Sequence, residues 1–521
     1  MFRFLGRRMQ PPKPPAAQQA SGNVPAAHAP AAIEPEARKN AGTVQAILQS
    51  PEDLVVREFT VGTDKRIFVL ICMDGLVDQK VVNESIIHPL QARYAEQSTS
   101  NSGNAFLADV ERDALAAFDI ERVSSLDDAL LSILSGDTAL FADGSTHAVI
   151  IGSRGYKTRP VQEPQTETII RGPREAFTED LRMNTALMRR RLRDPRLRFD
   201  SHRLGRRSKR DIVVVYIEGI VNPKLTEELT RRIKSIDIDD IEGSGYVEQF
   251  VADSFLSPFP LILNTERPDK MSAAVLQGRI GVLVDGDPFG LILPITFDSC
   301  IQSPEDYYQH WLVSSLTRVL RMFAAFLATF LPALYIALLE YHHGMLPTKL
   351  AFSIAGAREG VPFPAVIEAF AMEATLELLR EAGLRLPKPI GQTIGIVGGL
   401  VIGEAAVTAG IVSPIMVIVV AITAIASFSL PSYSFAISLR VMRFLVMLAA
   451  SVLGLYGIVL AYIIINVHIV NLRSFGVPYS TPFAPTFYGD WKDLILRAPI
   501  TMMKSRPTLT QPRNKTRLRK E

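Results

Sequence analysis

The sequence predicts an α/β cytosolic region of two repeated βα modules, followed by an α-helical polytopic membrane domain. The clearest observation is residues 389–430, an apolar stretch in which Glu404 is the one ionisable side chain. A membrane span needs roughly 20 apolar residues to cross about 30 Å of hydrocarbon, so this stretch is long enough for two spans. Residues 1–300 are instead rich in charge and contain two similar series of strand, helix and turn motifs.

The chain begins with residues 1–42, which are rich in Pro, Ala and Gln. They lack the apolar core of a signal peptide and are predicted to be a disordered tail, because their few apolar groups cannot offset chain entropy. The region before the first span is therefore expected to stay in the cytosol. The two cysteines, Cys72 and Cys300, form no CxxC motif, which argues against a disulfide framework or a cysteine zinc site.

Two modules, predicted at residues 43–165 and 211–302, open in the same way. The first contains RIFVLICMDGLVD at 66–78 and the second DIVVVYIEGIVN at 211–222. Each is a continuous apolar run, then an acid–glycine pair, then the start of an amphipathic helix. This order is typical of a buried strand that turns into a helix.

The two modules also end alike, each with Asp-Gly between two apolar runs, which is a hairpin signal. The acid–glycine pairs at Asp74 and Glu218 are 218 − 74 = 144 positions apart. The hairpin aspartates, Asp143 and Asp285, are 285 − 143 = 142 positions apart. Matching offsets at both ends indicate an internal repeat, and chance similarity of two strands is the alternative.

Residues 166–210, between the modules, are predicted to form a basic linker helix. Residues 182–210 contain twelve Lys or Arg and two Asp. A solvated helix is the favoured interpretation, and contact with anionic lipid or another subunit is the alternative. Nucleic-acid binding is not expected, because no aromatic residues alternate with the basic ones to stack on bases.

The transmembrane helical domain is predicted at residues 303–475, and a basic cytosolic tail at 476–521. Arg318 and Arg321, in the first turns of the first span, are expected to snorkel to the interface. Residues 361–386 carry several charges and predict an amphipathic helix that lies in the interface or inside a bundle without spanning. The four predicted spans are 312–339, 390–411, 414–431 and 441–469.

The distribution of charged residues does not decide which side of the membrane each end of these spans faces. Four spans place both chain ends in the cytosol, but they put Arg440 and Arg443 outside, against the positive-inside rule. If residues 361–386 also span, those arginines move inside and the basic tail moves outside. The four-span topology is preferred.

The long apolar stretch has two stripes on opposite helix faces. Small residues every four positions predict a helix-packing face, made of Gly391, Gly395, Gly399 and Gly403. The opposite face, apolar with one acid and one hydroxyl, predicts a pore lining, made of Ile394, Val397, Val401, Glu404 and Thr408. The alternative is that Glu404 pairs with an arginine of another helix in a static bundle.

Enzyme chemistry has little support in the sequence. No Walker A, HExxH or GxSxG motif occurs, so no catalytic residue and no cofactor are predicted. His342 and His343 are favoured as an interfacial pair over a metal site. The chain is therefore predicted not to be an enzyme.

Several long motifs, in order, resemble the A subunits of the GerA-type spore-germination receptors. The resemblance covers roughly residues 60–490. The motifs are YIEGIVNPKL (216–225), SPFPLILNTERPDK (257–270), SPEDYYQHW (303–311), REGVPFP (358–364), LREAGLRLPKPIGQTIGIVGGLVIGEAAV (379–407) and SPIMVIVVAITAIASFSLPSYS (413–434).

The resemblance implies a channel-forming subunit of a nutrient-gated germinant receptor that triggers spore germination by releasing ions. It implies a multi-pass protein of the inner membrane of the bacterial spore, with a cytosolic N-terminal domain. The implied partners are a polytopic, nutrient-binding B subunit, a lipoprotein C subunit, further copies of the same chain and the lipid bilayer. A secondary transporter and a non-conducting membrane scaffold are the alternative functions.

Overall fold

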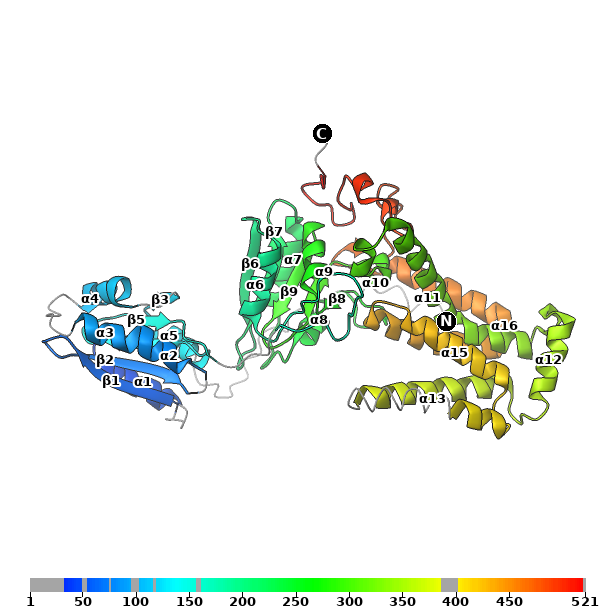
Figure 1. Cartoon of the computed structure of the whole chain (residues 1–521), viewed down its shortest axis with the longest axis horizontal. Coiled ribbons are helices and arrows are strands. Elements are labelled where there is room, and N and C mark those ends of the chain that lie inside the picture. Colours follow the sequence, from blue (N-terminus) through cyan, green and yellow to red (C-terminus); the bar gives the residue numbers. More distant parts are fainter. Residues whose placement is uncertain are drawn as a thin grey trace, which may run out of the picture. The chain divides into compact units, whose positions relative to one another are not determined.

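The computed structural model describes residues 32–48, 54–74, 76–94, 103–115, 119–155, 161–385 and 402–518. They divide into two compact units, Met1–Lys157 and Thr158–Glu521. The first unit contains one five-stranded sheet. The second contains a second five-stranded sheet, a group of long helices and a C-terminal segment (Figure 1).

The first sheet has the strand order β1-β2-β4-β5-β3, and every neighbouring pair is antiparallel. Its strands are β1 (Leu54–Val61), β2 (Arg66–Met73), β3 (Ile120–Val123), β4 (Thr138–Ala142) and β5 (Ala148–Ile151). Strands β2, β4 and β5 are buried on both faces because helices cover each side, which explains their unbroken apolar sequence. One face packs against α1 (Ala37–Leu48) and α5 (Leu126–Leu134). The other packs against α3 (His88–Arg93), α4 (Gly103–Asp109) and their neighbours.

The second sheet repeats this topology, with the order β6-β7-β9-β10-β8 and antiparallel pairs throughout. Its strands are β6 (Leu197–Leu204), β7 (Arg210–Ile217), β8 (Leu263–Thr265), β9 (Ile280–Val284) and β10 (Gly290–Leu293). Helices α7 (Pro223–Lys234) and α8 (Ser244–Val251) cover one face. Helices α6 (Leu181–Arg191) and α9 (Pro268–Leu276) cover the other.

Both predicted Asp-Gly hairpins are present. One joins β4 to β5 and the other joins β9 to β10. Gly144 and Gly286 have φ values of 82° and 80°, a left-handed conformation that glycine adopts at little cost. The mixture of helices and sheets is therefore confirmed, and antiparallel pairing is a detail that the apolar runs did not specify.

The repeat begins earlier in each module than the sequence predicted. The amide of Gly144 donates to Pro35 O at 2.7 Å, and the amide of Gly286 donates to Glu179 O at 2.8 Å. These equivalent bonds place α1 and α6 at matching positions. Residues 37–42 are thus not a disordered tail, because the small side chains of Ala37 and Ala41 are buried against the first sheet. Residues 1–31 lie outside the described residues.

The predicted basic linker helix at 166–210 is wrong for most of its length. Helix α6 occupies only Leu181–Arg191, and β6 is the edge strand that pairs with β7. In β6 the end residues Leu197 and Leu204 are buried, whereas the charged residues between them are half-buried or exposed. Charged side chains on an edge strand discourage pairing with other chains, and they gave this strand the composition of a linker.

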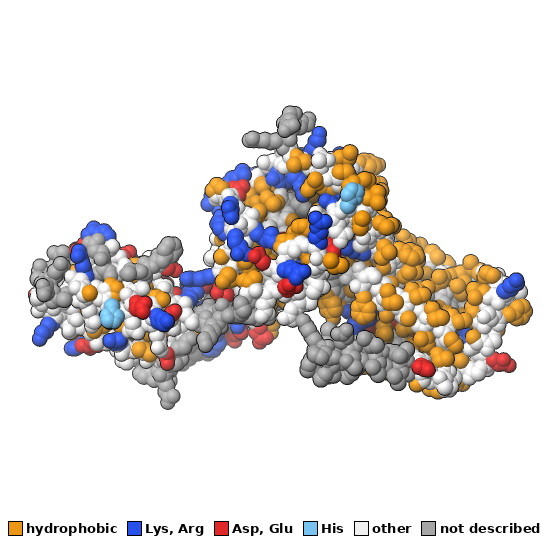
Figure 2. All heavy atoms as spheres, in the orientation of Figure 1, with side chains coloured by type: hydrophobic (Ala, Val, Ile, Leu, Met, Phe, Trp, Pro, Cys, Tyr) orange, Lys and Arg blue, Asp and Glu red, His pale blue; other side chains and the backbone are white. Residues whose placement is uncertain are grey.

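Five described helices of the second unit form a group that we call the helical bundle. They are α11 (Trp311–Glu340), α12 (Thr348–Arg358), α13 (Ala365–Arg385), α15 (Pro414–Phe428) and α16 (Tyr433–Asn471), and residues 402–408 are also helical. By length and composition, α11 and α16 are long and apolar enough to cross a membrane, and α15 is apolar but shorter. Exposed apolar side chains cover much of the visible bundle surface (Figure 2).

Helix α16 is two helices that fold back on each other at Gly454. This glycine has φ 60° and ψ −138°, outside the helical region. The ring of Phe259 lies 6.3 Å from that of Phe435 and 6.0 Å from that of His468, between ring centroids, although these residues are near opposite ends of α16. The predicted single span at 441–469 is therefore wrong. A one-residue turn at glycine inside an apolar run leaves no polar break for hydropathy to detect.

The C-terminal segment, residues 473–518, packs on the second module. Arg506 Nε donates to Leu276 O at 2.7 Å, and Thr510 Oγ1 donates to Gln277 O at 3.1 Å. The amide of Arg513 donates to Ile220 O at 3.0 Å. The basic composition of this segment therefore does not keep it away from the folded part of the chain.

Candidate ion path and surrounding buried charges

The predicted pore face and packing face are described only in part. Three of their residues, Gly403, Glu404 and Thr408, are in the described helix 402–408. The remaining candidates lie outside the described residues: Gly391, Ile394, Gly395, Val397, Gly399 and Val401.

The three described candidates point to different surroundings. Gly403 is buried, and a Cβ placed on it would lie 3.5 Å from Val417 Cγ1 of α15. Glu404 and Thr408 are exposed, and Thr408 Oγ1 donates to Glu404 O at 2.8 Å. Among the described residues Glu404 has no ion-pair partner. The glycine thus lies against a helix, while the acid and hydroxyl are available on the surface of the chain.

Replacing Gly403 by leucine is expected to destabilise the bundle by about 1–3 kcal/mol. The added Cβ would already touch Val417, so the rest of the branched side chain would have to displace its neighbours. Thermal unfolding of the detergent-solubilised chain measures this. Gly356→Leu is the matched control, since this glycine of α12 has nothing within 4 Å of the new Cβ. Equal unfolding temperatures for the two variants would rule out the packing role of Gly403.

A fully buried ion pair joins α13 to the first segment of α16. Arg443 Nη1 donates to Glu373 Oε2, and both side chains have 0% exposure. Two oppositely charged groups are stable at such depth only when each neutralises the other. Helix α13 was predicted to lie in the interface or in a bundle, and this pair places its charges inside the bundle.

A second group of charged side chains lies between α13 and α16, nearer the end of α13. Arg380 Nη1 donates to Glu377 Oε1 at 2.9 Å, and Arg440 Nε lies 3.9 Å from the same oxygen. The Arg380 guanidinium also stacks 5.3 Å from the ring centroid of Phe428, at the end of α15. Arg440 and Arg443 therefore pair with acids of α13 where α13 packs against α16. They do not lie in a loop between spans.

The other end of α13 lies at the end of α11. Glu340 Oε1 accepts the amide of Ala365 at 2.7 Å, which caps the start of α13. The amide of Ser413 donates to Glu368 Oε2 at 2.8 Å, and Arg358 Nη2 lies 3.0 Å from Glu368 Oε1. The 21 residues of α13 therefore run about 31 Å along the bundle, from the end of α11 to Phe428.

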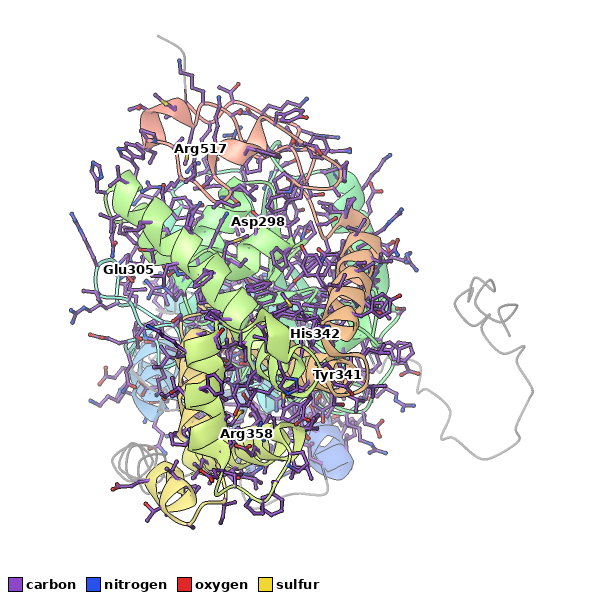
Figure 3. The ribbon with its side chains drawn as sticks, turned by 90° about the vertical axis from the view of Figure 1, so that its right-hand side faces the viewer. Asp298, Glu305, Tyr341, His342, Arg358 and Arg517 are labelled. Atoms are coloured by element: carbon purple, nitrogen blue, oxygen red, sulfur yellow. The ribbon has the colours of Figure 1, made fainter. Side chains whose placement is uncertain are left out.

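The turn of α16 lies at this same end. A Cβ on Gly454 would lie 3.0 Å from Tyr341 Cβ and 2.9 Å from His342 Cε1. Tyr341 Oη donates to Ser451 O at 2.5 Å. Figure 3 shows Tyr341 and His342 side by side where α11 ends, with Arg358 on α12 beyond them.

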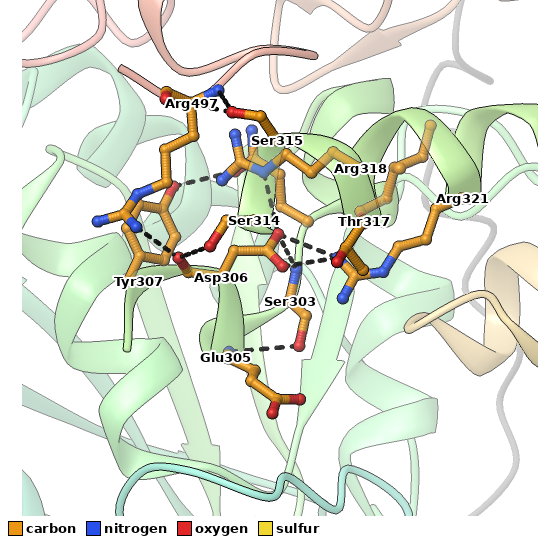
Figure 4. Close-up of polar contacts among 12 residues, drawn as sticks. Ser303, Glu305, Asp306, Tyr307, Ser314, Ser315, Thr317, Arg318, Arg321 and Arg497 are labelled. Carbon is orange, nitrogen blue, oxygen red and sulfur yellow. Dashed lines mark hydrogen bonds and ion pairs between the residues drawn. The ribbon is translucent and has the colours of Figure 1, made fainter. Parts of the chain in front are cut away.

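A third group of buried charges surrounds Asp306, just before α11 (Figure 4). Its carboxylate accepts Arg318 Nε at 3.0 Å and Arg321 Nη1 at 2.9 Å. Arg318 Nη1 also donates to Asp493 Oδ1 of the C-terminal segment at 2.9 Å. Arg497 Nη1, from the same segment, donates to Asp306 O at 2.7 Å. Arg318 and Arg321 are thus buried and paired, and the expectation that they snorkel to an interface is wrong.

Tyr307 completes this group. Its hydroxyl donates to Asp493 Oδ2 at 2.8 Å. Burial, followed by the charge of Asp493, raises the pKa of the Tyr307 hydroxyl, so the group stays protonated and acts as a donor. The start of α11, the preceding turn and the C-terminal segment are therefore held together by one set of charge-assisted bonds.

Sequence reasoning missed these ion pairs. Glu373 and Asp306 were visible as acids in apolar or aromatic surroundings, but their partners Arg443 and Arg318 are 70 and 12 positions away. The sequence did offer one indication of these pairs, because a charged residue in an apolar helix needs a partner. Within the described residues, no group of three or more His, Cys, Asp or Glu side chains has a metal-binding arrangement.

A family model described as Bacillus/Clostridium GerA spore germination protein matches residues 42–509. The chain belongs to the GerA family. The resemblance found in the motifs is therefore confirmed, and the family match extends beyond the region those motifs covered. This GerA-family chain is a germinant-receptor A-subunit homologue and not an enzyme.

Three relatives of this GerA-family chain match it over nearly their whole length. Spore germination protein GerLA of Bacillus cereus is 48% identical over 90% of this chain and 94% of its own. Spore germination protein B1 of Bacillus subtilis (strain 168) is 42% identical over 94% of this chain and all of its own. The uncharacterized membrane protein YfkQ of the same strain is 42% identical over 91% of both chains.

One solved structure is also similar in sequence. It is the crystal structure of the N-terminal domain of the A subunit of the Bacillus megaterium spore germinant receptor GerK3. It is 31% identical, covers 52% of this GerA-family chain and 98% of its own, and superposes with a TM-score of 0.22.

Proposed function

We propose that this chain is the channel-forming A subunit of a nutrient-gated germinant receptor, which triggers germination by releasing cations from the spore. The observation that carries the proposal is the orientation of helix 402–408. Gly403 is buried against α15, whereas Glu404 and Thr408 are exposed. In a ring of identical chains, such a face would place one carboxylate per copy along a shared path, which favours cations.

We further propose that the bundle crosses the membrane six times. Helix α11 runs away from the second module, and α13 runs back, since α13 begins beside Glu340 at the end of α11 and its later part lies beside Phe428. The chain then returns to Ser413, which bonds Glu368 near the start of α13, and α15 runs back again. The two segments of α16, 433–453 and 455–471, add a further pair.

The C-terminal segment supports an even number of crossings. It bonds the second module through Arg506 and Thr510, so it must lie on the same side of the membrane as that module. Six crossings satisfy this requirement, and they also place Arg440 and Arg443 near the module side. We assign that side to the cytosol, as the positive-inside rule favours.

The proposal includes the location and partners that the family resemblance implied. The chain acts in the inner membrane of the spore, with a polytopic, nutrient-binding B subunit and a lipoprotein C subunit. It forms a homo-oligomer around the ion path, in contact with the lipid bilayer. The names of GerLA and protein B1 as spore germination proteins support the germination role on which these partners and this location depend.

Glu404→Gln tests the ion path directly. Removing the carboxylate is expected to lower cation-over-anion selectivity severalfold while the complex still assembles, because the side-chain volume is preserved. The measurement is the reversal potential of the receptor in liposomes under a KCl gradient. Glu381→Gln is the matched control, since this exposed acid of α13 pairs with Arg385 and with no other cation among the described residues.

An unchanged reversal potential for Glu404→Gln would exclude Glu404 from the path. Saturable flux of a solute would identify a transporter instead of a channel. Absence of any conductance in an assembled complex would favour a scaffold.

Val397 and Val401 are proposed to close the channel at rest, as a narrow apolar neck that excludes water. Val397→Ser and Val401→Ser are expected to admit water and leak cations, so that spores germinate without nutrient. Potassium release from unstimulated spores measures the leak. Ile396→Ser lies off this stripe and is the control. Quiescent spores in both valine variants would place the gate elsewhere.

A further inference from the structure

The loop between α8 and β8 exposes two large apolar side chains. Phe255 is 89% exposed and Leu256 is 81% exposed. Both belong to the second module, whose other apolar side chains are largely packed in its two cores. Two adjacent apolar side chains in solvent are a liability unless something covers them.

The residues that follow hold this loop against α16. Ser257 Oγ lies 3.1 Å from His468 Nε2, and Ser438 Oγ donates to Pro258 O. The ring of Phe259 packs between those of Phe435 and His468. The loop therefore touches both segments of α16, at the end opposite the turn at Gly454.

The position of this contact along α16 can be compared with the thickness of a bilayer. The hydrocarbon core is about 30 Å thick, which a helix crosses in roughly 20 residues. About 20 residues before Gly454 is Phe435, which contacts Phe259. The loop thus lies where α16 would pass from hydrocarbon into the headgroup region. Phe428 and Tyr433, at the same end of the bundle, are also exposed aromatics, at 70% and 53%.

We propose that Phe255 and Leu256 insert into the lipid boundary between headgroups and acyl chains and anchor the second module to the membrane. Aromatic side chains concentrate at this boundary, and a Phe–Leu pair there removes apolar surface from water. Lipid is the favoured occupant because the loop contacts both segments of α16, and α16 exposes many apolar side chains. The inference rests on the proposed insertion of these helices in the membrane and does not depend on ion conduction.

A spin label at position 256 tests the anchor in the full chain. Leu256→Cys is introduced after replacing Cys72 and Cys300 by alanine, and the protein is reconstituted in lipid nanodiscs. Frequent collisions of the label with oxygen indicate that it lies in lipid. Frequent collisions with a water-soluble nickel chelate indicate that it lies in water. Leu448→Cys, on α16 and 56% exposed, is the lipid reference. Met183→Cys, on α6 and 42% exposed, is the water reference.

The expected result is an oxygen-to-nickel ratio at position 256 that exceeds the Met183 value severalfold and approaches that of Leu448. Phe255→Cys should give the same result from the neighbouring side chain. A ratio equal to that of Met183 overturns the anchor while leaving the proposed membrane insertion intact. Spin–spin broadening at 256 overturns it in favour of contact with a second copy. Nickel access at Leu448 would overturn membrane insertion itself, and the anchor with it.

Discussion

Arg443→Leu is expected to destabilise the helical bundle by about 3–5 kcal/mol, because it leaves the Glu373 carboxylate buried without its partner. Both side chains have 0% exposure, so water cannot replace the lost charge. The free energy of unfolding in detergent micelles, from denaturant titration, measures the loss.

The pair Arg385–Glu381 is the matched control on the same helix. Its side chains are 78% and 59% exposed, so Arg385→Leu is expected to cost no more than about 1 kcal/mol. Replacing both buried partners, Glu373→Leu with Arg443→Leu, is expected to recover much of the loss, because no unpaired charge then remains. Equal effects for Arg443→Leu and Arg385→Leu would contradict the buried pair.

Asp306→Ala is expected to lower the free energy of unfolding by a similar amount, about 3–5 kcal/mol. Among the described residues it leaves Arg321 without a carboxylate partner and Arg318 with only Asp493. The same variant should loosen the C-terminal segment, since Arg318 also holds Asp493. Thermal unfolding measures the first effect. The rate of proteolytic cleavage within residues 473–518 measures the second.

Glu305→Ala is the control for this variant. Glu305 is the neighbouring acid, and its side chain accepts a bond from Gln309 at 2.8 Å without an ion pair among the described residues. The free energy of unfolding of this variant is expected to lie within about 1 kcal/mol of that of the unchanged chain. If Asp306→Ala behaves like Glu305→Ala, the charges around α11 do not hold the C-terminal segment in place.

The sequence predicted features that depend on neighbouring residues. The Asp-Gly hairpins at Asp143 and Asp285 were found because a turn between two apolar runs is set by a few adjacent residues. The family was found in the same way, from motifs that are continuous in the chain. Gly403 lies beside Val417, and Glu404 and Thr408 are exposed, but the packing face and the pore face are each described only in part and both stay predictions.

Features that depend on distant partners were not found. The strand β6 had the composition of a linker, and only its pairing with β7 shows that it belongs to the second sheet. The turn at Gly454 was hidden because both segments of α16 are equally apolar.

The charges of α13 were read as a sign that the helix does not span. Whether a charge can lie in an apolar bundle depends on its partner, and the partner of Glu373 is 70 residues further along the chain. Local sequence thus determined which residues carry charge and where the apolar runs lie. The tertiary structure decided which charges are neutralised, because that depends on which helices come into contact.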